Sequence, residues 1–388
     1  MRKSVIERLY SIFVVLAFGL LFFANAEAQE APNGVVYNLG IGKAFYVPCG
    51  LALLSSFFLP KKRDKLDGAL LVLILVAIFS SLLHPPLSET FLSWEVTRFI
   101  FAILCFKDIR NIDPLMFAKH VAIASPFIIF PHYLLSDPFS YGPYRYGGFY
   151  GDPNFLALAL NIIISLCYIT FRHQKGVFIR ILCVGSIVGA IPLIMFGMSR
   201  GGILGLAVVL TAILVNIFKK SKLGFVMMSI ILILVGGYFT KKTSETIDLI
   251  ESRYQAESEA DRIGVRARIE GVQSAFRVLS NRPELIPFGI GLGNTYDTRA
   301  EYRDDGFRSS YVIHNTYVSL LYELGLIGLI LYLMIYFYAF RQLLRQRSLL
   351  LLGILLSAIV SLFTLPGAAF MPGWILLFFM TNKSLYLV

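Results

Sequence analysis

Charged residues are scarce in this chain of 388 residues: 15% of its residues are charged and 57% are hydrophobic. Soluble globular domains carry about 25% charged residues, so this chain cannot cover a surface in contact with water. That deficit excludes a soluble enzyme, and the hydrophobic content excludes a disordered chain. The four cysteines show no CxxC spacing, so neither a metal site nor a disulfide framework is indicated. The remaining class is a polytopic membrane protein, in which lipid covers the apolar surface.

Apolar runs long enough to cross a bilayer recur along the chain. Because lipid supplies no hydrogen-bond partners for the backbone, such runs are expected to be helices. We therefore predict an all-α polytopic membrane protein with about twelve transmembrane helices. The predicted spans are residues 9–26, 40–59, 66–84, 91–106, 115–135, 154–171, 178–198, 201–218, 223–239, 316–340, 348–365 and 367–382.

The basic residues orient these spans, since Lys and Arg accumulate in cytoplasmic loops. With a cytoplasmic N-terminus, the connections on the inside hold 19 of the 35 Lys and Arg residues. These connections are 1–8, 60–65, 107–113, 172–180, 219–222, 341–347 and 383–388. The short outer connections hold only Lys43, Arg145 and Arg200. We therefore expect both termini in the cytoplasm, and we interpret the net charge of +11 as an orientation signal rather than as a sign of nucleic-acid binding.

The chain divides into transmembrane helices 1–9 (1–239), a large periplasmic loop (240–315) and transmembrane helices 10–12 (316–388). The loop holds 12 acidic and 11 basic residues and is too long to be a mere connector, which favours a functional role. Residues 244–280 have apolar side chains at helical spacing, and prolines and glycines follow them. Residues 1–28 also resemble a cleavable signal peptide, and residue 29 lies outside on either interpretation.

A first polar cluster is predicted at the outer face in residues 141–154. Asp152 is a good N-cap, and Pro153 suits the first position of a helix. Capping does not account for Arg145, which is surrounded by the aromatic residues Tyr141, Tyr144, Tyr146, Phe149 and Tyr150. These rings suit either the membrane interface or a platform for sugars beside a phosphate-binding arginine. Both interpretations stay open.

A second outer feature is Met198-Ser-Arg-Gly-Gly202, a tight break within a long apolar stretch. We expect Gly201 and Gly202 to supply flexible backbone for a turn between two antiparallel helices. Arg200 is not needed for that turn, and it is the one charge between Arg180 and Lys219. An arginine there either reaches the lipid headgroups or has a function.

The third outer feature is His314-Asn315, where the large loop meets the tenth span. Asn315 is a possible helix cap, and His314 is the one histidine of five with this polar approach. Glu323 would lie roughly 13 Å deeper in the membrane and needs a cationic partner, for which Arg98 is a candidate.

Cofactor motifs are missing from the sequence. Gly289-Ile-Gly-Leu-Gly293 lacks the strand that precedes a dinucleotide-binding loop. No Walker motif, zinc spacing or paired carboxylates are found either, so we expect no cofactor and no metal.

In this order, the three features resemble the O-antigen ligase/polymerase family of bacterial surface-polysaccharide glycosyltransferases. The resemblance covers about residues 140–330 and rests on Gly148-Phe-Tyr-Gly-Asp-Pro-Asn154, Ser199-Arg-Gly-Gly202, Arg268 through Pro283 to Gly289-Ile-Gly-Leu-Gly-Asn294, and the stretch from His314 to Gly328. The family usually has a tryptophan four residues after the loop arginine, where this chain has Val272. The counterpart of that arginine is therefore Arg266 or Arg268, and the distance to Pro283 favours Arg268.

The resemblance implies a C-type, metal-independent glycosyltransferase in the bacterial inner membrane. It would take a glycan from undecaprenyl diphosphate and pass it to an acceptor sugar at the periplasmic face. The resemblance assigns catalysis to Arg200, Arg268 and His314. The residues expected to bind substrate are Arg145, Arg266, Asn154, Asn315 and Arg98.

The residue types suit this chemistry, because arginines can neutralise a leaving diphosphate and a histidine can accept the proton of a sugar hydroxyl. The leading hypothesis is a polymerase that extends one lipid-linked chain onto another lipid-linked repeat unit. A ligase that transfers the chain to lipid A–core is the alternative, and a transporter or flippase is a third hypothesis. Membrane lipid and a chain-length regulator are further candidate partners.

Overall fold

The computed structural model describes most of the apolar part of the chain. The described residues are 2–23, 29–30, 36–37, 44–60, 64–84, 94–134, 147–148, 152–197, 199–222, 226, 268–292, 313–365, 371–382 and 384–385. They are helical apart from connections and one short antiparallel pair of strands, β1 (Gln29–Glu30) and β2 (Val36–Tyr37). The all-α prediction is thus confirmed for the described part of the chain.

Helices occupy every predicted span except 223–239, which lies outside the described residues apart from position 226. They are α1 (Arg2–Leu21), α2 (Tyr46–Ser56), α3 (Lys65–Leu83), α4 (Trp94–Phe106), α5 (Pro114–Leu134), α6 (Pro153–His173), α7 (Val177–Phe196), α8 (Arg200–Lys220), α11 (Thr316–Gln346), α12 (Leu349–Leu362) and α13 (Met371–Met380). A further helix, called the loop helix below, covers 268–281. Short 3₁₀ turns are formed by η2 (Lys107–Asn111) and η4 (Pro283–Leu285).

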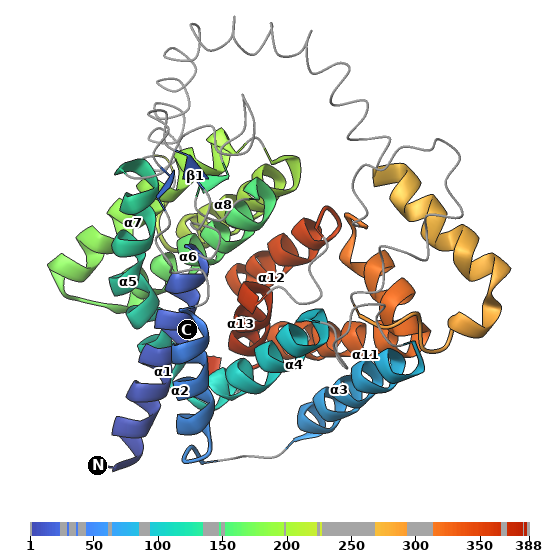
Figure 1. Cartoon of the computed structure of the whole chain (residues 1–388). Coiled ribbons are helices and arrows are strands. Elements are labelled where there is room, and N and C mark those ends of the chain that lie inside the picture. Colours follow the sequence, from blue (N-terminus) through green and yellow to red (C-terminus); the bar gives the residue numbers. More distant parts are fainter. Residues whose placement is uncertain are drawn as a thin grey trace, which may run out of the picture.

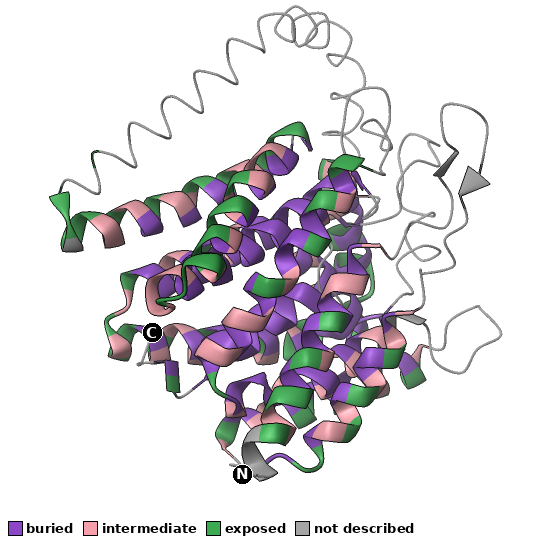
Figure 2. Ribbon diagram, turned by 90° about the vertical axis from the view of Figure 1, so that its left-hand side faces the viewer, coloured by how far each residue is buried: buried purple, intermediate pink, exposed green. Residues whose placement is uncertain are grey.

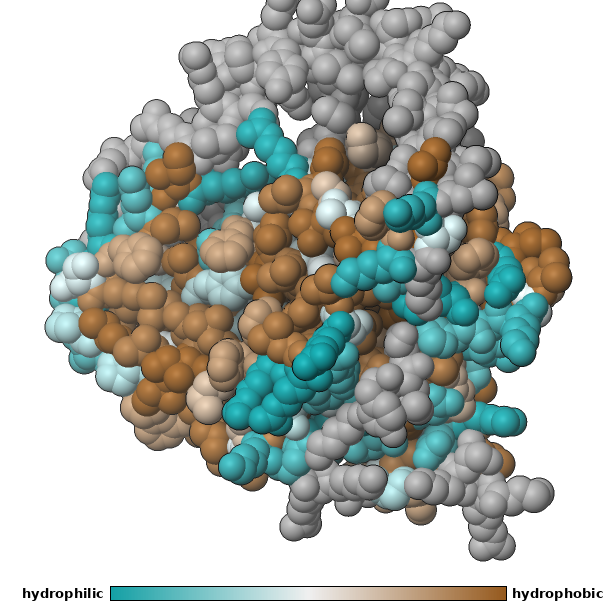
Figure 3. Space-filling view, turned by 180° about the vertical axis from the view of Figure 1, so that it is seen from behind, coloured by the Kyte–Doolittle hydropathy of each residue, from teal (hydrophilic) through white to brown (hydrophobic). Residues whose placement is uncertain are grey.

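Among the described residues, six helices are long and apolar enough to cross a membrane: α3, α5, α6, α7, α8 and α11. Shorter apolar helices are α2, α12 and α13. These helices show a membrane protein, while the total of about twelve spans stays a prediction. Hydrophobic side chains cover a broad part of the face shown in Figure 3, as expected for a surface in lipid.

Helix α6 lies at the centre of the packed helices, and 89% of its most apolar stretch is buried. It contacts α5, α7 and α8, and α8 packs in turn along α12. By contrast, 28% of the corresponding stretch of α7 is buried, because α7 lies at the outside. Figure 1 shows α11 running beside α3, and Figure 2 shows buried residues between the helices with exposed ones around them. The sequence motifs that open α6 and α8 are therefore held by the best-packed part of the molecule.

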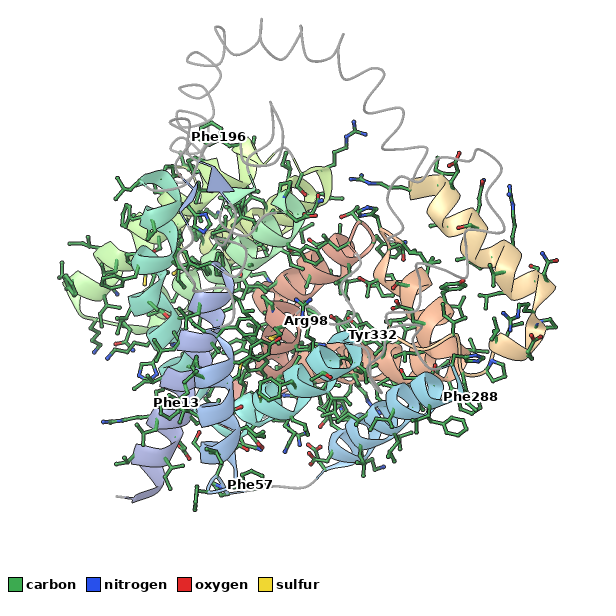
Figure 4. All side chains as sticks on the ribbon, in the orientation of Figure 1. Phe13, Phe57, Arg98, Phe196, Phe288 and Tyr332 are labelled. Atoms are coloured by element: carbon green, nitrogen blue, oxygen red, sulfur yellow. The ribbon has the colours of Figure 1, made fainter. Side chains whose placement is uncertain are left out.

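Connections that the charge pattern assigns to the same side contact one another. The Arg110 guanidinium of η2 binds the carboxylates of Asp64 and Asp67, which form the capping box of α3. The Asn382 amide donates to the carbonyls of Ile109 and Ile112 on the same turn. In Figure 4, Phe57 and Phe196, which lie at the ends of α2 and α7, are at opposite ends of the bundle. The N-terminus lies at the Phe57 end (Figure 1).

Replacing Arg110 with alanine is expected to destabilise the fold by about 2 kcal/mol or more, because its buried charge neutralises two carboxylates that would be left facing each other. This destabilisation is smaller than that expected for breaking a fully buried ion pair, since both aspartates are partly exposed. The measurement is the midpoint of thermal unfolding of the purified protein in detergent. Arg345→Ala, at an exposed position near the end of α11, is the control and should leave the midpoint unchanged.

Candidate active site

The beginning of α6 is fixed as the sequence predicted. The Asp152 carboxylate accepts hydrogen bonds from the backbone N–H groups of Asn154 (2.7 Å) and Phe155 (3.3 Å), and Pro153 is the first helical residue. A short side chain with an acceptor oxygen caps a helix in this way because the first N–H groups have no partner within it. Asn154, predicted to bind substrate, is 6% exposed. Its role in binding substrate stays a prediction.

Asn154 joins the first motif to the second. The Ser199 hydroxyl donates to Asn154 Oδ1 at 2.6 Å, and Ser199 Oγ accepts from the backbone N–H of Gly202 at 3.0 Å, which caps α8. Two segments 45 residues apart in the sequence therefore meet in one buried polar contact. Arg200, the first residue of α8, is exposed beside that contact.

Gly201 and Gly202 have a different role from the predicted one. Both lie within α8 rather than in the turn before it. A Cβ atom at Gly201 would collide with the Thr364 side chain, and one at Gly202 would collide with Ala157. The expectation that they supply flexible backbone for the turn was wrong: they let α8 approach α6 and the end of α12 closely.

The third motif, at the beginning of α11, contacts the residues that follow α12, and these residues also pack on α8. The Thr316 hydroxyl donates to the Leu365 carbonyl at 2.6 Å, next to the Thr364 that packs on Gly201. Asn315 Oδ1 accepts from the N–H groups of Tyr317 (3.0 Å) and Val318 (3.1 Å), so the predicted cap of α11 is confirmed. The half-buried His314 directly precedes this cap.

The loop helix packs against the first turns of α11. Its residues Ala275, Val278 and Leu279 form a small core with Leu285, Ile290, Ile313 and Tyr322. Val272, at the position of the expected tryptophan, packs against this core. Arg268 is half-buried and lies four residues before Val272, on the same side of the loop helix. The core therefore joins the arginine segment of the loop to Ile313, the neighbour of His314.

Residues 286–291 bind to a break in α11. Gly325 has φ 69° and ψ −174°, which interrupts the helix. The N–H groups of Ile290 and Gly291 donate to the carbonyls of Tyr322 (3.0 Å) and Glu323 (2.9 Å). In return, the Leu326 N–H donates to the Ile286 carbonyl at 2.7 Å. The loop thus replaces helical hydrogen bonds that the break removes.

Part of the chain that forms this site is similar to a known protein family. The family model described as O-antigen ligase matches residues 185–333, from α7 through the loop helix into α11. Residues 185–333 of this chain are therefore similar to the O-antigen ligase family. No curated protein matches the chain.

The family match confirms the resemblance drawn from the sequence for residues 185–333. This stretch contains Arg200, Arg268, His314 and Asn315, whereas Asn154 and Arg98 lie before it. Asn154 lies outside the matched residues but is hydrogen-bonded to Ser199, which lies within them. Arg145 and Arg266, two other predicted site residues, lie outside the residues that the structure describes.

Glu323 is buried beside the break in α11. Its carboxylate accepts from the Ser319 hydroxyl at 3.0 Å, and its carbonyl also accepts from the Ser80 hydroxyl of α3 at 2.9 Å. Arg98 lies half-buried on α4, and Figure 4 shows it between α4 and α13. An ion pair between Arg98 and Glu323 stays a prediction.

Sequence reasoning missed the end of α3. His84 is the C-cap of α3 and interacts electrostatically with Arg282 and Glu284, which follow the loop helix. On the same helix, Phe79 packs edge-on against Phe288 at 4.9 Å between ring centroids, and Figure 4 shows Phe288 beside α3. The available signal was Phe288, a large aromatic residue directly before Gly289. Within the described residues no group of three or more His, Cys, Asp or Glu side chains could hold a metal ion.

Gly325→Ala is expected to release residues 286–291 from α11 and to destabilise the protein by about 2 kcal/mol, because this backbone conformation is nearly restricted to glycine. The new Cβ would also collide with Pro287 and Phe288. Hydrogen exchange followed by mass spectrometry should show faster exchange of the amides of Ile290 and Gly291. Gly185→Ala in α7 is the matched control, since a Cβ there meets no atom within 4 Å. Unchanged exchange in Gly325→Ala would contradict this role for the break.

Proposed function

We propose that this protein transfers a glycan from undecaprenyl diphosphate to an acceptor sugar at the outer face of the bacterial inner membrane. The similarity of residues 185–333 to the O-antigen ligase family supports a membrane enzyme of the O-antigen ligase/polymerase type. The single observation that supports the finer proposal most is the junction of three motifs: Asn154 with Ser199, Gly201 with Thr364, and Leu365 with Thr316. This junction holds the segments of Arg200 and His314 together at one end of the bundle.

In the proposed reaction an acceptor hydroxyl attacks the anomeric carbon of the lipid-linked sugar. The new carbon–oxygen bond forms while the bond from that carbon to the diphosphate oxygen breaks. His314 accepts the hydroxyl proton, and the diphosphate leaves with the electron pair. A single displacement of this kind inverts the anomeric configuration.

Arginine is the residue that neutralises the leaving group in this proposal. Arg200 and Arg268 can each form paired hydrogen bonds with phosphate oxygens, which stabilise the negative charge that develops on the leaving group. Arg200 is the first residue of α8, where the positive end of the helix dipole would also attract the leaving diphosphate. The reaction as proposed involves no metal ion.

The orientation of the protein is part of the proposal. The contact of Arg110 joins connections 60–65 and 107–113, which hold four and two basic residues, whereas the contact of Asn154 with Ser199 joins two short outer connections in which the basic residues are Arg145 and Arg200. This separation supports cytoplasmic termini and a periplasmic active site.

A polymerase is the proposed activity, and a ligase that uses lipid A–core as acceptor is the second candidate. The balanced charge of loop 240–315, with 12 acidic and 11 basic residues, favours a polymerase because it offers no dense cationic patch for core phosphates. The family description, O-antigen ligase, favours the second candidate.

Arg200→Ala and His314→Ala are expected to lower the rate of glycan transfer by about 10²-fold or more each, since each removes a group that acts in the transition state. The assay uses purified protein with undecaprenyl-diphosphate-linked glycan and a chelator, and the products are separated by size. Arg200→Lys should retain part of the activity, because lysine keeps the charge without the paired geometry. Arg341→Ala, at an exposed position near the other end of α11, is the control. Full activity in both alanine variants, with normal elution on size exclusion, would rule out this mechanism.

Deletion of the gene is expected to leave lipopolysaccharide cores that carry a single repeat unit, because a polymerase acts before the chain is attached to the core. Gel electrophoresis of the lipopolysaccharide provides the measurement. Bare cores together with accumulated lipid-linked polymer would instead identify the ligase. Complementation with Arg341→Ala and with His314→Ala separates loss of the protein from loss of its chemistry.

A further inference from the structure

A cavity of about 520 Å³ opens between α1, α5 and the end of α6. It is distinct from the candidate active site, which is built at the beginnings of α6, α8 and α11. The residues that line it come from connections 1–8, 107–113 and 172–180 and from the first turns of α5, so it lies on the face predicted to be cytoplasmic. Its volume is within the range of pockets that hold small ligands, about 300–1,000 Å³.

Hydrogen-bond donors from three elements line this cavity. Arg8 comes from α1, Lys119 and His120 come from α5, and Gln174 is the C-cap of α6. His120 has a fixed orientation, because its Nδ1 atom is hydrogen-bonded to Ser11 Oγ of α1 at 2.7 Å. Donors that converge in this way suit an anion with several acceptor oxygens.

The charge of the cavity is positive even though one acid lines it. Arg8 and Lys119 carry two positive charges, and Asp113 carries one negative charge. The Asp113 carboxylate accepts the backbone N–H of Leu115 at 2.9 Å, so it is engaged in capping α5. Two cations against one engaged carboxylate favour an anion as the occupant.

Apolar side chains complete the wall. Leu115 and Met116 line the cavity beside the polar groups, and both are half-buried. A free inorganic anion would gain nothing from these two side chains. A lipid has both a phosphate and apolar chains, and basic pockets between transmembrane helices on the cytoplasmic side suit anionic headgroups.

We propose that this cavity binds the phosphate-bearing headgroup of an anionic phospholipid from the cytoplasmic leaflet. The phosphate oxygens accept hydrogen bonds from Arg8, Lys119 and Gln174, and the glycerol and the start of the acyl chains contact Leu115 and Met116. The bound lipid links α1 to α5 and α6 and offsets the positive charge of Arg8 and Lys119. Binding to the folded state alone then stabilises the protein in proportion to lipid concentration.

The experiment titrates the purified full-length protein with phosphatidylglycerol and, separately, with phosphatidylcholine, and it reads bound lipid by native mass spectrometry. Phosphatidylglycerol should bind more tightly than phosphatidylcholine. Arg8→Gln and Lys119→Gln should each weaken phosphatidylglycerol binding about fivefold, as expected for one basic residue near an anionic lipid. Arg8→Lys should retain most of the affinity. Arg341→Gln, which removes a positive charge at an exposed position on α11, is the matched control.

Three results would overturn the proposal. Equal binding of the two lipids by the unaltered protein would do so without any variant, so a variant that fails to fold does not leave the question open. An equal loss in Arg341→Gln would show general surface attraction. Displacement of phosphatidylglycerol by inorganic phosphate at the same concentration would identify a site for a soluble phosphate. None of these readouts depends on glycan transfer.

Discussion

The close approach of α8 to α6 and α12 is the constraint on which the rest of the structure depends. Helices in lipid gain little by burying apolar side chains against each other, so contact between small residues and hydrogen bonds must hold them together. Gly202 lies against Ala157, and the Asn161 amide donates to the Gly202 carbonyl at 3.1 Å. On the other side, the Ser357 hydroxyl of α12 donates to the Gly205 carbonyl at 2.8 Å. A larger side chain at either glycine would move the first turn of α8, and Arg200 with it.

The break in α11 depends on a second constraint, the need to pair every backbone group that leaves a helix. Gly325 ends one helical segment, and the carbonyls of Tyr322 and Glu323 receive their donors from the loop. Gly289, with φ 71°, lies directly against this turn, where a Cβ would collide with the backbone of Glu323. Two glycines far apart in the sequence are thus required by one contact. Through it, a segment of the large loop becomes a fixed part of the membrane bundle and carries the loop helix to its place beside Ile313.

Local features of this fold could be predicted from the sequence, whereas contacts between distant segments could not. The caps at Asp152 and Asn315 were predicted correctly, because a cap depends on residues two or three positions away. The positions of the helices followed from the apolar runs, although α2 begins later than predicted, at Tyr46. The glycines after Arg200 were misjudged because a helical glycine and a turn glycine look alike until the neighbouring helix is known. The hydrogen bond between Asn154 and Ser199 could not be predicted, because neither motif indicates which distant residue it contacts.

Arg200 places a cation at the positive end of a helix, and in the proposed reaction both would attract the same anionic group. The N-terminus of a helix carries a partial positive charge, which a cation on the first residue opposes. Structural needs at this point are met by Ser199, which caps the helix, and by Gly201, which packs on Thr364. An arginine adds to neither. In the proposed reaction the guanidinium and the helix dipole attract the same negative charge, and they do so most strongly when that charge grows as the leaving group departs.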